Sequence, residues 1–202
     1  MPGAPFALPI WIYAVGMMAF MAMNSVLALF LRNRFGVTEQ SIGWFYAYVG
    51  AISVVMRAML LGPAVRRFGE GGVVRLGIAS LAIGLLSIPF TTSVWILGVA
   101  VLFIPVGTAL LFPATSSMVS ALAPRDSTGQ ALGVQQSFGG VARLLGPIWA
   151  GSLFEIGDRV PFWTGSALMA LLLVPSLSLS RRIERAVVAT PPTPLESTTP
   201  SS

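Results

Sequence analysis

The chain is built from long apolar runs with almost no charged side chains, and this feature limits its possible folds more than any other. The first run, from Ala7 to Leu31, contains no Asp, Glu, Lys or Arg. About 20 apolar residues are enough for a helix to cross the hydrocarbon core of a bilayer, where each segment must satisfy its own backbone hydrogen bonds. Only 9% of all residues are charged and 55% are hydrophobic, whereas a soluble domain carries about 25% charged residues. The sequence therefore predicts membrane-spanning helices.

Six apolar segments can be drawn, so we expect an all-α membrane protein with six transmembrane helices. The expected spans are Ala7–Leu31, Ile42–Gly62, Val73–Phe90, Val94–Ser117, Gln130–Phe154 and Pro161–Leu179. They make up a transmembrane domain over residues 1–185. Residues 186–202 are rich in Pro, Thr and Ser, a composition that predicts a disordered cytoplasmic tail.

The distribution of arginine predicts the orientation of these spans. One side of the predicted topology carries seven arginines, namely Arg66, Arg67, Arg75, Arg125, Arg181, Arg182 and Arg185. The other side carries three, namely Arg32, Arg34 and Arg159. Because positively charged loops stay in the cytoplasm, we expect both termini there and a multi-pass protein of the cytoplasmic membrane, the plasma or inner membrane.

Composition also excludes several classes of function. The chain has no Cys and no His, which removes the usual zinc sites and the nucleophiles activated by histidine. No phosphate-binding loop of the Walker type is present. The arginines flank apolar runs, a pattern typical of membrane topology and not of nucleic-acid binding. We therefore expect a non-enzyme without cofactor or metal, whose first partner is the lipid bilayer.

Arg143 is the strongest candidate for a functional residue. It lies inside the fifth span, where a charge at mid-membrane is unfavourable by at least about 2.5 kcal/mol and must face protein or water. Gln136, Gly140, Arg143 and Pro147 follow a spacing that places them on one helical face. One interpretation is a polar stripe along a substrate pathway. The other is a structural tie from Arg143 to a backbone carbonyl freed by Pro147.

Two other spans offer polar side chains for such a pathway. In the second span, Tyr46, Ser53 and Arg57 share a face, and Arg57 either lines the pathway or extends to the lipid headgroups. In the first span, Asn24 is the one strongly polar side chain. It either lines the pathway or bonds to a neighbouring helix.

Small residues and a proline mark the fifth span. Gly129, Gly133 and Ser137 recur every four residues, a spacing that lets two helices approach closely. Gly146 and Pro147 predict a bend in this helix, because proline lacks the backbone donor and clashes with the preceding turn.

The connection between the second and third spans resembles a known signature. Its sequence runs from Gly62 through Arg66 and Arg67 to Phe68-Gly69, similar to the loop signature of the major facilitator superfamily. Gly146 and Pro147 in the fifth span resemble the drug-efflux branch of that superfamily. Arg66 stands where the signature usually has Asp, and Glu70 where it has a basic residue. Such degeneration resembles the C-terminal half of these transporters.

The resemblance implies a function and a missing partner. Transporters of this superfamily have twelve helices in two halves, and their substrate sites lie between the halves near the bilayer midplane. The chain then resembles a C-terminal six-helix half of a secondary active transporter for a small molecule, such as an efflux carrier, that needs an opposing six-helix half. The alternative is a six-helix membrane subunit that transports nothing, or an inactive truncated remnant.

Overall fold

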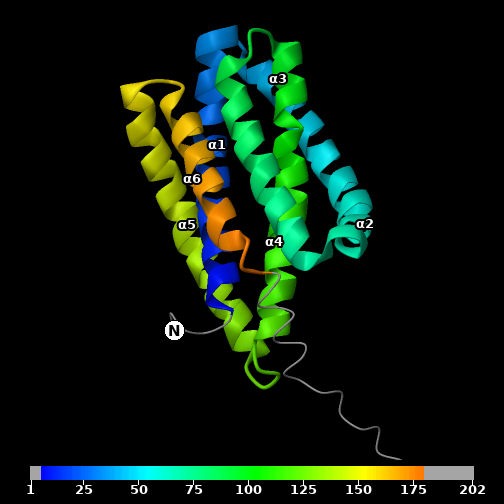
Figure 1. The fold of residues 1–202 in the computed structure, drawn as a ribbon. Helices are drawn as coiled ribbons and strands as arrows, with labels where there is room; N and C mark the ends of the chain where they lie inside the picture. The colour runs from blue at the N-terminus through cyan, green and yellow to red at the C-terminus, as the bar shows by residue number, and fades with distance from the viewer. Residues whose placement is uncertain (1–5, 180–202) are drawn as a thin grey trace, which may run out of the picture.

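The computed structural model describes residues 6–179, except the side chains of Glu39 and Gln40. This part of the chain is a bundle of helices (Figure 1). Its elements are α1 (Ala7–Phe35), α2 (Glu39–Ser87), the 3-10 helix η1 (Ile88–Phe90), α3 (Val94–Val101), α4 (Phe103–Leu122), α5 (Thr128–Ile156) and α6 (Val160–Ser176). The predicted tail over residues 186–202 lies outside the described residues.

Glycines in the left-handed region end one helix and fold another back on itself. At the end of α1, Gly36 has φ 64° and its N–H donates to the carbonyl of Arg32, a conformation that favours glycine. Within α2, Gly69 has φ 65° and ψ 168°, so α2 consists of a first arm, residues 39–68, and a second arm, residues 70–87. The expected end of the second span at Gly62 and start of the third at Val73 are wrong, because helix continues on both sides of Gly69.

The fourth predicted span is divided between two helices. α3 ends at Val101 and α4 begins at Phe103, and between them the N–H of Leu102 donates to the carbonyl of Val99 at 3.1 Å. Pro105 follows three residues later and has no N–H to donate to the preceding turn. The interruption therefore lies where a proline removes one helical hydrogen bond.

Two pairs of helices approach closely through glycines. A Cβ added at Gly77, in the second arm of α2, would lie 2.8 Å from the backbone nitrogen of Leu111 in α4. One added at Gly107 of α4 would lie 2.9 Å from the backbone nitrogen of Leu81. In the other pair, a Cβ at Gly146 of α5 would lie 2.7 Å from the carbonyl oxygen of Met18 in α1. The bundle thus contains an α1–α5 pair and an α2–α4 pair.

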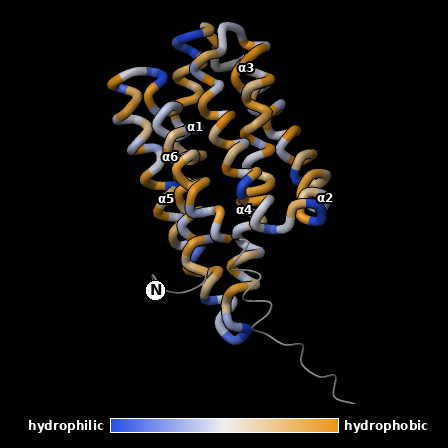
Figure 2. The backbone as a smooth tube through the Cα atoms, in the orientation of Figure 1, coloured by the Kyte–Doolittle hydropathy of each residue, from blue (hydrophilic) through white to orange (hydrophobic). Residues whose placement is uncertain are grey.

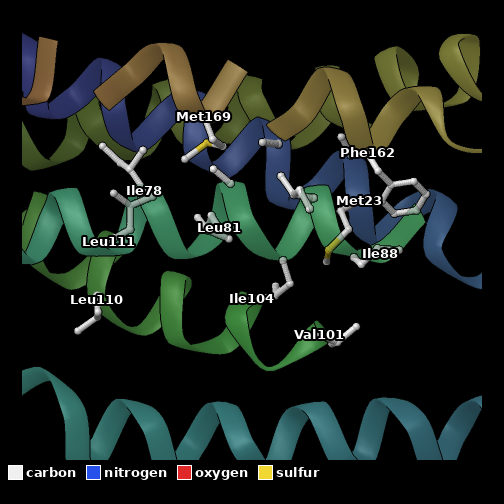
Figure 3. Packing of buried hydrophobic residues seen from close by; sticks show 14 of the residues in the cluster. Met23, Ile78, Leu81, Ile88, Val101, Ile104, Leu110, Leu111, Phe162 and Met169 are labelled. Carbon is white, nitrogen blue, oxygen red and sulfur yellow. The ribbon is translucent and has the colours of Figure 1, made fainter. Parts of the chain in front are cut away.

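A large apolar core joins these pairs to α6. Its side chains come mainly from α1, the second arm of α2, α4 and α6, as Figure 3 shows with Met23, Ile78, Leu111 and Met169. Phe30 and Phe162 pack edge to face with ring centroids 5.0 Å apart. The first arm of α2 borders this core along one side only, and many of its apolar residues are exposed.

Most residues along the length of the bundle are hydrophobic, and hydrophilic residues gather mainly at its ends (Figure 2). Within the described residues, three helical stretches are long and apolar enough to cross a membrane, namely Ala7–Phe35, the folded-back stretch Ser41–Phe90, and Val94–Leu122. Val160–Ser176 is a shorter apolar helix. The chain turns at Gly36, Thr92 and Gly157 at one end of the bundle, and at Gly69 and Asp126 at the other (Figure 1).

Candidate functional site

A cavity lies where the first arm of α2 diverges from α1 and α4. Its volume is ≈ 50 Å³, enough for a few water molecules or a small chemical group. Three predicted pathway residues from two helices meet in its wall: Asn24, Tyr46 and Ser53. Its other lining residues are mainly apolar: Phe20, Met23, Leu27, Phe45, Val49, Val101, Ile104, Pro105 and Thr108.

The polar side chains of this cavity direct their donors to their own helices. Asn24 Nδ2 donates to the carbonyl of Phe20 at 2.8 Å, and Ser53 Oγ donates to that of Val49 at 2.8 Å. Thr108 Oγ1 donates to the carbonyl of Pro105 at 3.2 Å. Their oxygen lone pairs remain for a ligand. The cavity therefore combines aromatic and aliphatic walls with hydrogen-bond acceptors.

Arg57 lies one helical turn beyond Ser53 on the first arm of α2 and is exposed. It is not part of the cavity wall, and it makes no interaction with another described residue. The Arg57 guanidinium is therefore near the cavity along the helix, but it does not line the cavity together with Asn24 and Tyr46.

The outer face of α5 carries the other predicted pathway residues. Gln136, Arg143 and Pro147 are exposed along this face, and a Cβ added at Gly140 would meet no atom within 4 Å. Gln136 Oε1 accepts a hydrogen bond from Tyr13 Oη at 3.4 Å. Arg143 makes no interaction with the part of the chain that the structure describes, so the expected tie to a carbonyl freed by Pro147 is not formed there. α5 is one continuous helix through Gly146 and Pro147.

The predicted packing stripe of α5 also faces outward. A Cβ added at Gly129 or Gly133 would meet no atom within 4 Å, and Ser137 is exposed. The buried residues of the helix form a different set, namely Ala131, Gln135, Gly139, Ala142, Gly146 and Ala150, and Gly139, Ala142 and Gly146 among them lie against α1. The predicted stripe of Gly129, Gly133 and Ser137 therefore packs against no other helix among the described residues.

The loop-signature residues lie where α2 folds back. Gly62, Arg66 and Arg67 are exposed on the first arm, and the Arg67 guanidinium lies 5.9 Å from the centroid of the Phe68 ring. After the kink at Gly69, the carboxylate of Glu70 accepts a hydrogen bond from Ser117 Oγ of α4.

Sequence reasoning did not find the rest of the cavity or a buried glutamine. Phe20, Phe45 and Thr108 line the cavity, but apolar residues and threonine are common throughout the spans and gave no signal. Gln135 is completely buried, and its neighbour Gln136 was the one predicted. Gln135 lies four residues after Ala131 and four before Gly139, both buried, and this spacing is the signal that separates the two glutamines.

An apolar helical bundle of this kind, with a cavity between its helices and hydrophilic ends, defines a multi-pass membrane protein. Comparison with known proteins identifies the family: the chain belongs to the Major Facilitator Superfamily, whose model matches residues 10–200. The family consists of transporters, which agrees with the expectation of a non-enzyme.

Individual relatives include drug-resistance proteins. The class D tetracycline resistance protein of Salmonella ordonez is 25% identical over 173 residues, covering 84% of this chain and 44% of that protein. Multidrug resistance protein 1 of Bacillus subtilis is 27% identical over 153 residues, covering 74% of this chain and 38% of that protein. These matches agree with the predicted resemblance to drug-efflux transporters.

The fold has a close match among solved structures. The crystal structure of the human organic anion transporter MFSD10 superposes with a TM-score of 0.77 at 22% identity, covering 85% of this chain and 40% of that one. The chain therefore spans less than half the length of each of these relatives.

Proposed function

We propose that this chain is the C-terminal six-helix half of a secondary active transporter that moves a small molecule out across the cytoplasmic membrane. Its six spans are α1, the two arms of α2, α3 with α4, α5, and α6. The family match and the coverage of 40% of a transporter of known structure support a half. The degenerate loop signature at Arg66 and Glu70 supports the C-terminal one.

The observation that carries this proposal is the outer face of α5. Arg143 lies 15 residues after the first residue of α5 and 13 before the last, so it is near the middle of the membrane if this helix spans it. A charge there is unfavourable against lipid. The same face presents Gln136 and the open glycines Gly133 and Gly140, which allow another helix to approach. An opposing half that encloses an aqueous pathway accounts for all four residues.

The cavity between α1, α2 and α4 supplies a wall of that pathway. Asn24, Tyr46 and Ser53 offer hydrogen-bonding groups within an aromatic surround, and Arg57 and Arg143 offer positive charge. Pathways of this composition suit amphipathic organic molecules. The names of the relatives associate those proteins with tetracycline, with multiple drugs and with organic anions, and these classes are the first substrates to test.

A cellular accumulation assay tests the proposal. The chain is co-expressed with an opposing six-helix half from the same source, and cells are loaded with tetracycline, ethidium or carboxyfluorescein. Reduced accumulation of at least one probe is expected with both halves together. Neither half alone, nor the pair carrying Arg143→Leu at equal membrane abundance, should reduce it. Equal accumulation of every probe in cells with and without the pair would overturn the proposal.

A further inference from the structure

An open groove lies between the end of the second arm of α2 and the start of α3. Its volume is ≈ 360 Å³, at the lower end of the range for pockets that hold small organic molecules. Most of its lining residues are apolar: Leu86, Ser87, Phe90, Thr91, Ile96 and Ala100. None of them lines the cavity between α1, α2 and α4, so the groove is a separate feature of the surface.

The wall of the groove suits a hydrocarbon chain. Leu86, Phe90 and Ile96 are large apolar side chains that are exposed, and Ala100 is buried at their side. Exposed apolar side chains that gather in this way mark contact with lipid or with a partner. The groove also has length, because Ala100 lies about 9 Å along α3 from Val94 at 1.5 Å per residue.

Arg34 supplies a positive charge at the polar end of the groove. The end of α1 lies at the same end of the bundle as the turn before α3 (Figure 1). Arg34 Nε donates to the carbonyl of Thr91, in the groove wall, at 3.3 Å, and the side chain is half-buried. Both Nη groups remain as donors, and together they form a planar fork that binds phosphate through paired hydrogen bonds.

Arg34 is also the donor that an anionic group would meet there. The hydroxyls of the groove donate to the backbone: Thr91 Oγ1 to the carbonyl of Ile88 at 2.8 Å, and Ser87 Oγ to that of Ile83 at 2.6 Å. No carboxylate among the described residues forms an ion pair with Arg34. The charge of this end is therefore complementary to an anion that a ligand brings.

Two tryptophans place the polar end of the groove at the membrane surface. Trp95 precedes Ile96 in α3 and is exposed. Trp163 of α6 lies against Phe90, with ring centroids 6.5 Å apart. Because tryptophan favours the headgroup level of a bilayer, Arg34 lies at that level and Ala100 lies deeper. A cation at the headgroups above an apolar wall is the arrangement that matches a phospholipid.

We propose that this groove binds a phospholipid. The phosphate diester accepts paired hydrogen bonds from the Nη groups of Arg34, and an acyl chain lies along Leu86, Ile96 and Ala100. The bond from Arg34 Nε to Thr91 holds the guanidinium in place before the lipid arrives, which lowers the entropy lost on binding. Binding requires neither a substrate nor an opposing half, so the test is separate from the proposed transport.

Native mass spectrometry of the purified full chain in detergent measures the binding, with dipalmitoyl phosphatidylglycerol as the probe. We expect Arg34→Gln to raise the Kd of this lipid by about tenfold, because hydrogen bonds to a charged donor are lost. Arg32→Gln is the matched control, since Arg32 is an exposed arginine in the same last turn of α1, and it should leave the Kd unchanged. An unchanged Kd with Arg34→Gln, or equal effects of the two variants, would overturn the proposal.

Two further ligands separate the phospholipid from its parts. Dipalmitoylglycerol, which has the same acyl chains and no phosphate, should bind about tenfold more weakly. Inorganic phosphate, which has no acyl chain, should not displace the lipid. Equal binding of dipalmitoylglycerol would show a purely apolar groove, and displacement by inorganic phosphate would show a simple anion site. Either result would contradict a phospholipid site.

The place of the acyl chain is tested with two apolar residues on the same arm. Leu86 and Ile83 are 47% and 46% exposed, but Leu86 lines the groove and Ile83 does not. Leu86→Ala should raise the Kd by about threefold or more, because apolar contact area is lost, and Ile83→Ala should not change it. Equal effects would place the lipid elsewhere on the surface. Loss of the bound lipid when the opposing half is added would assign the groove to that half, and both results refute the proposal.

Discussion

Arg143 is a charged residue that the fold of this chain does not use. It is exposed and makes no interaction with the described residues, so its removal should not disturb packing. We expect Arg143→Leu to change the free energy of unfolding by no more than about 0.5 kcal/mol and to leave membrane abundance equal or higher, because a charge in lipid is unfavourable. Thermal unfolding in detergent and quantitative immunoblotting measure both.

Substitutions of Arg143 should change transport although they do not change stability. If Arg143 binds an anionic group through its planar fork, Arg143→Lys should fail as well as Arg143→Leu, since an ammonium cannot form the paired hydrogen bonds. The measurement is the initial transport rate of the complete carrier at matched protein level. Full transport by Arg143→Leu would remove this residue from the pathway.

Tyr46 permits a test of the cavity that removes a single oxygen. Its hydroxyl makes no hydrogen bond with a described residue, whereas that of Tyr48, on the same arm, donates to the carbonyl of Gly98 at 3.5 Å. If substrate occupies the cavity, Tyr46→Phe should raise KM by roughly threefold to tenfold, the value of one hydrogen bond. Tyr48→Phe is the matched control and should leave KM unchanged. The same small change in both variants would argue against a substrate contact at Tyr46.

The candidate site could be predicted from the sequence only in part. A polar residue inside an apolar run is visible in a linear sequence, so Asn24, Ser53 and Arg143 were found. Which of them share a cavity depends on how far the first arm of α2 stands from α1, a tertiary feature. The cavity therefore unites Asn24 and Ser53 but not Arg143, and its aromatic wall at Phe20 could not be seen in advance.

Among the elements, the crossing of α4 over the second arm of α2 depends on glycine. Cβ atoms added at Gly77 and Gly107 would meet backbone atoms at 2.8 and 2.9 Å, and backbone cannot rotate away. Gly77→Ala and Gly107→Ala should each destabilise the fold by about 1–3 kcal/mol through overpacking. Gly133→Ala, with no atom within 4 Å, should be neutral or stabilise by up to about 1 kcal/mol through helix propensity. Chemical denaturation in mixed micelles distinguishes these results, and equal effects of all three would refute the close crossing.

Element boundaries were harder to predict than element positions. The six apolar segments correspond to helical stretches, because length and hydropathy are properties of sequence. The interruptions at Gly69 and Leu102 were not predicted in their observed form. The residues between the second and third expected spans, 63–72, form helix apart from Gly69, although Gly71 and Gly72 have low helix propensity. The break at Leu102 depends on the local hydrogen bonding before Pro105 and has no hydropathy signal.

At the scale of the whole molecule, three of the five tryptophans lie at one end of the bundle, whereas Trp11, 55% exposed, lies near the start of α1 at the other end. Trp44, Trp95 and Trp163 lie near the starts of α2, α3 and α6, at the end with the Thr92 turn. Trp44 and Trp95 are 81% and 88% exposed. Tryptophan favours the membrane–water interface, so these side chains fit the headgroup level on that side. The opposite end carries the Asp126 turn and the arginines 66, 67, 75 and 125.

The orientation of the bundle follows from this arrangement and can be tested with single cysteines. Arginine-rich connections remain in the cytoplasm, so the Asp126 turn should be cytoplasmic and the Thr92 turn external. Both residues are exposed, and the chain contains no Cys to interfere. In intact cells, a membrane-impermeant maleimide should label Thr92→Cys and leave Asp126→Cys unlabelled until the cells are permeabilised. Labelling of Asp126→Cys alone would invert the topology, and equal labelling of both in intact cells would contradict a membrane-spanning bundle with its turns on opposite sides.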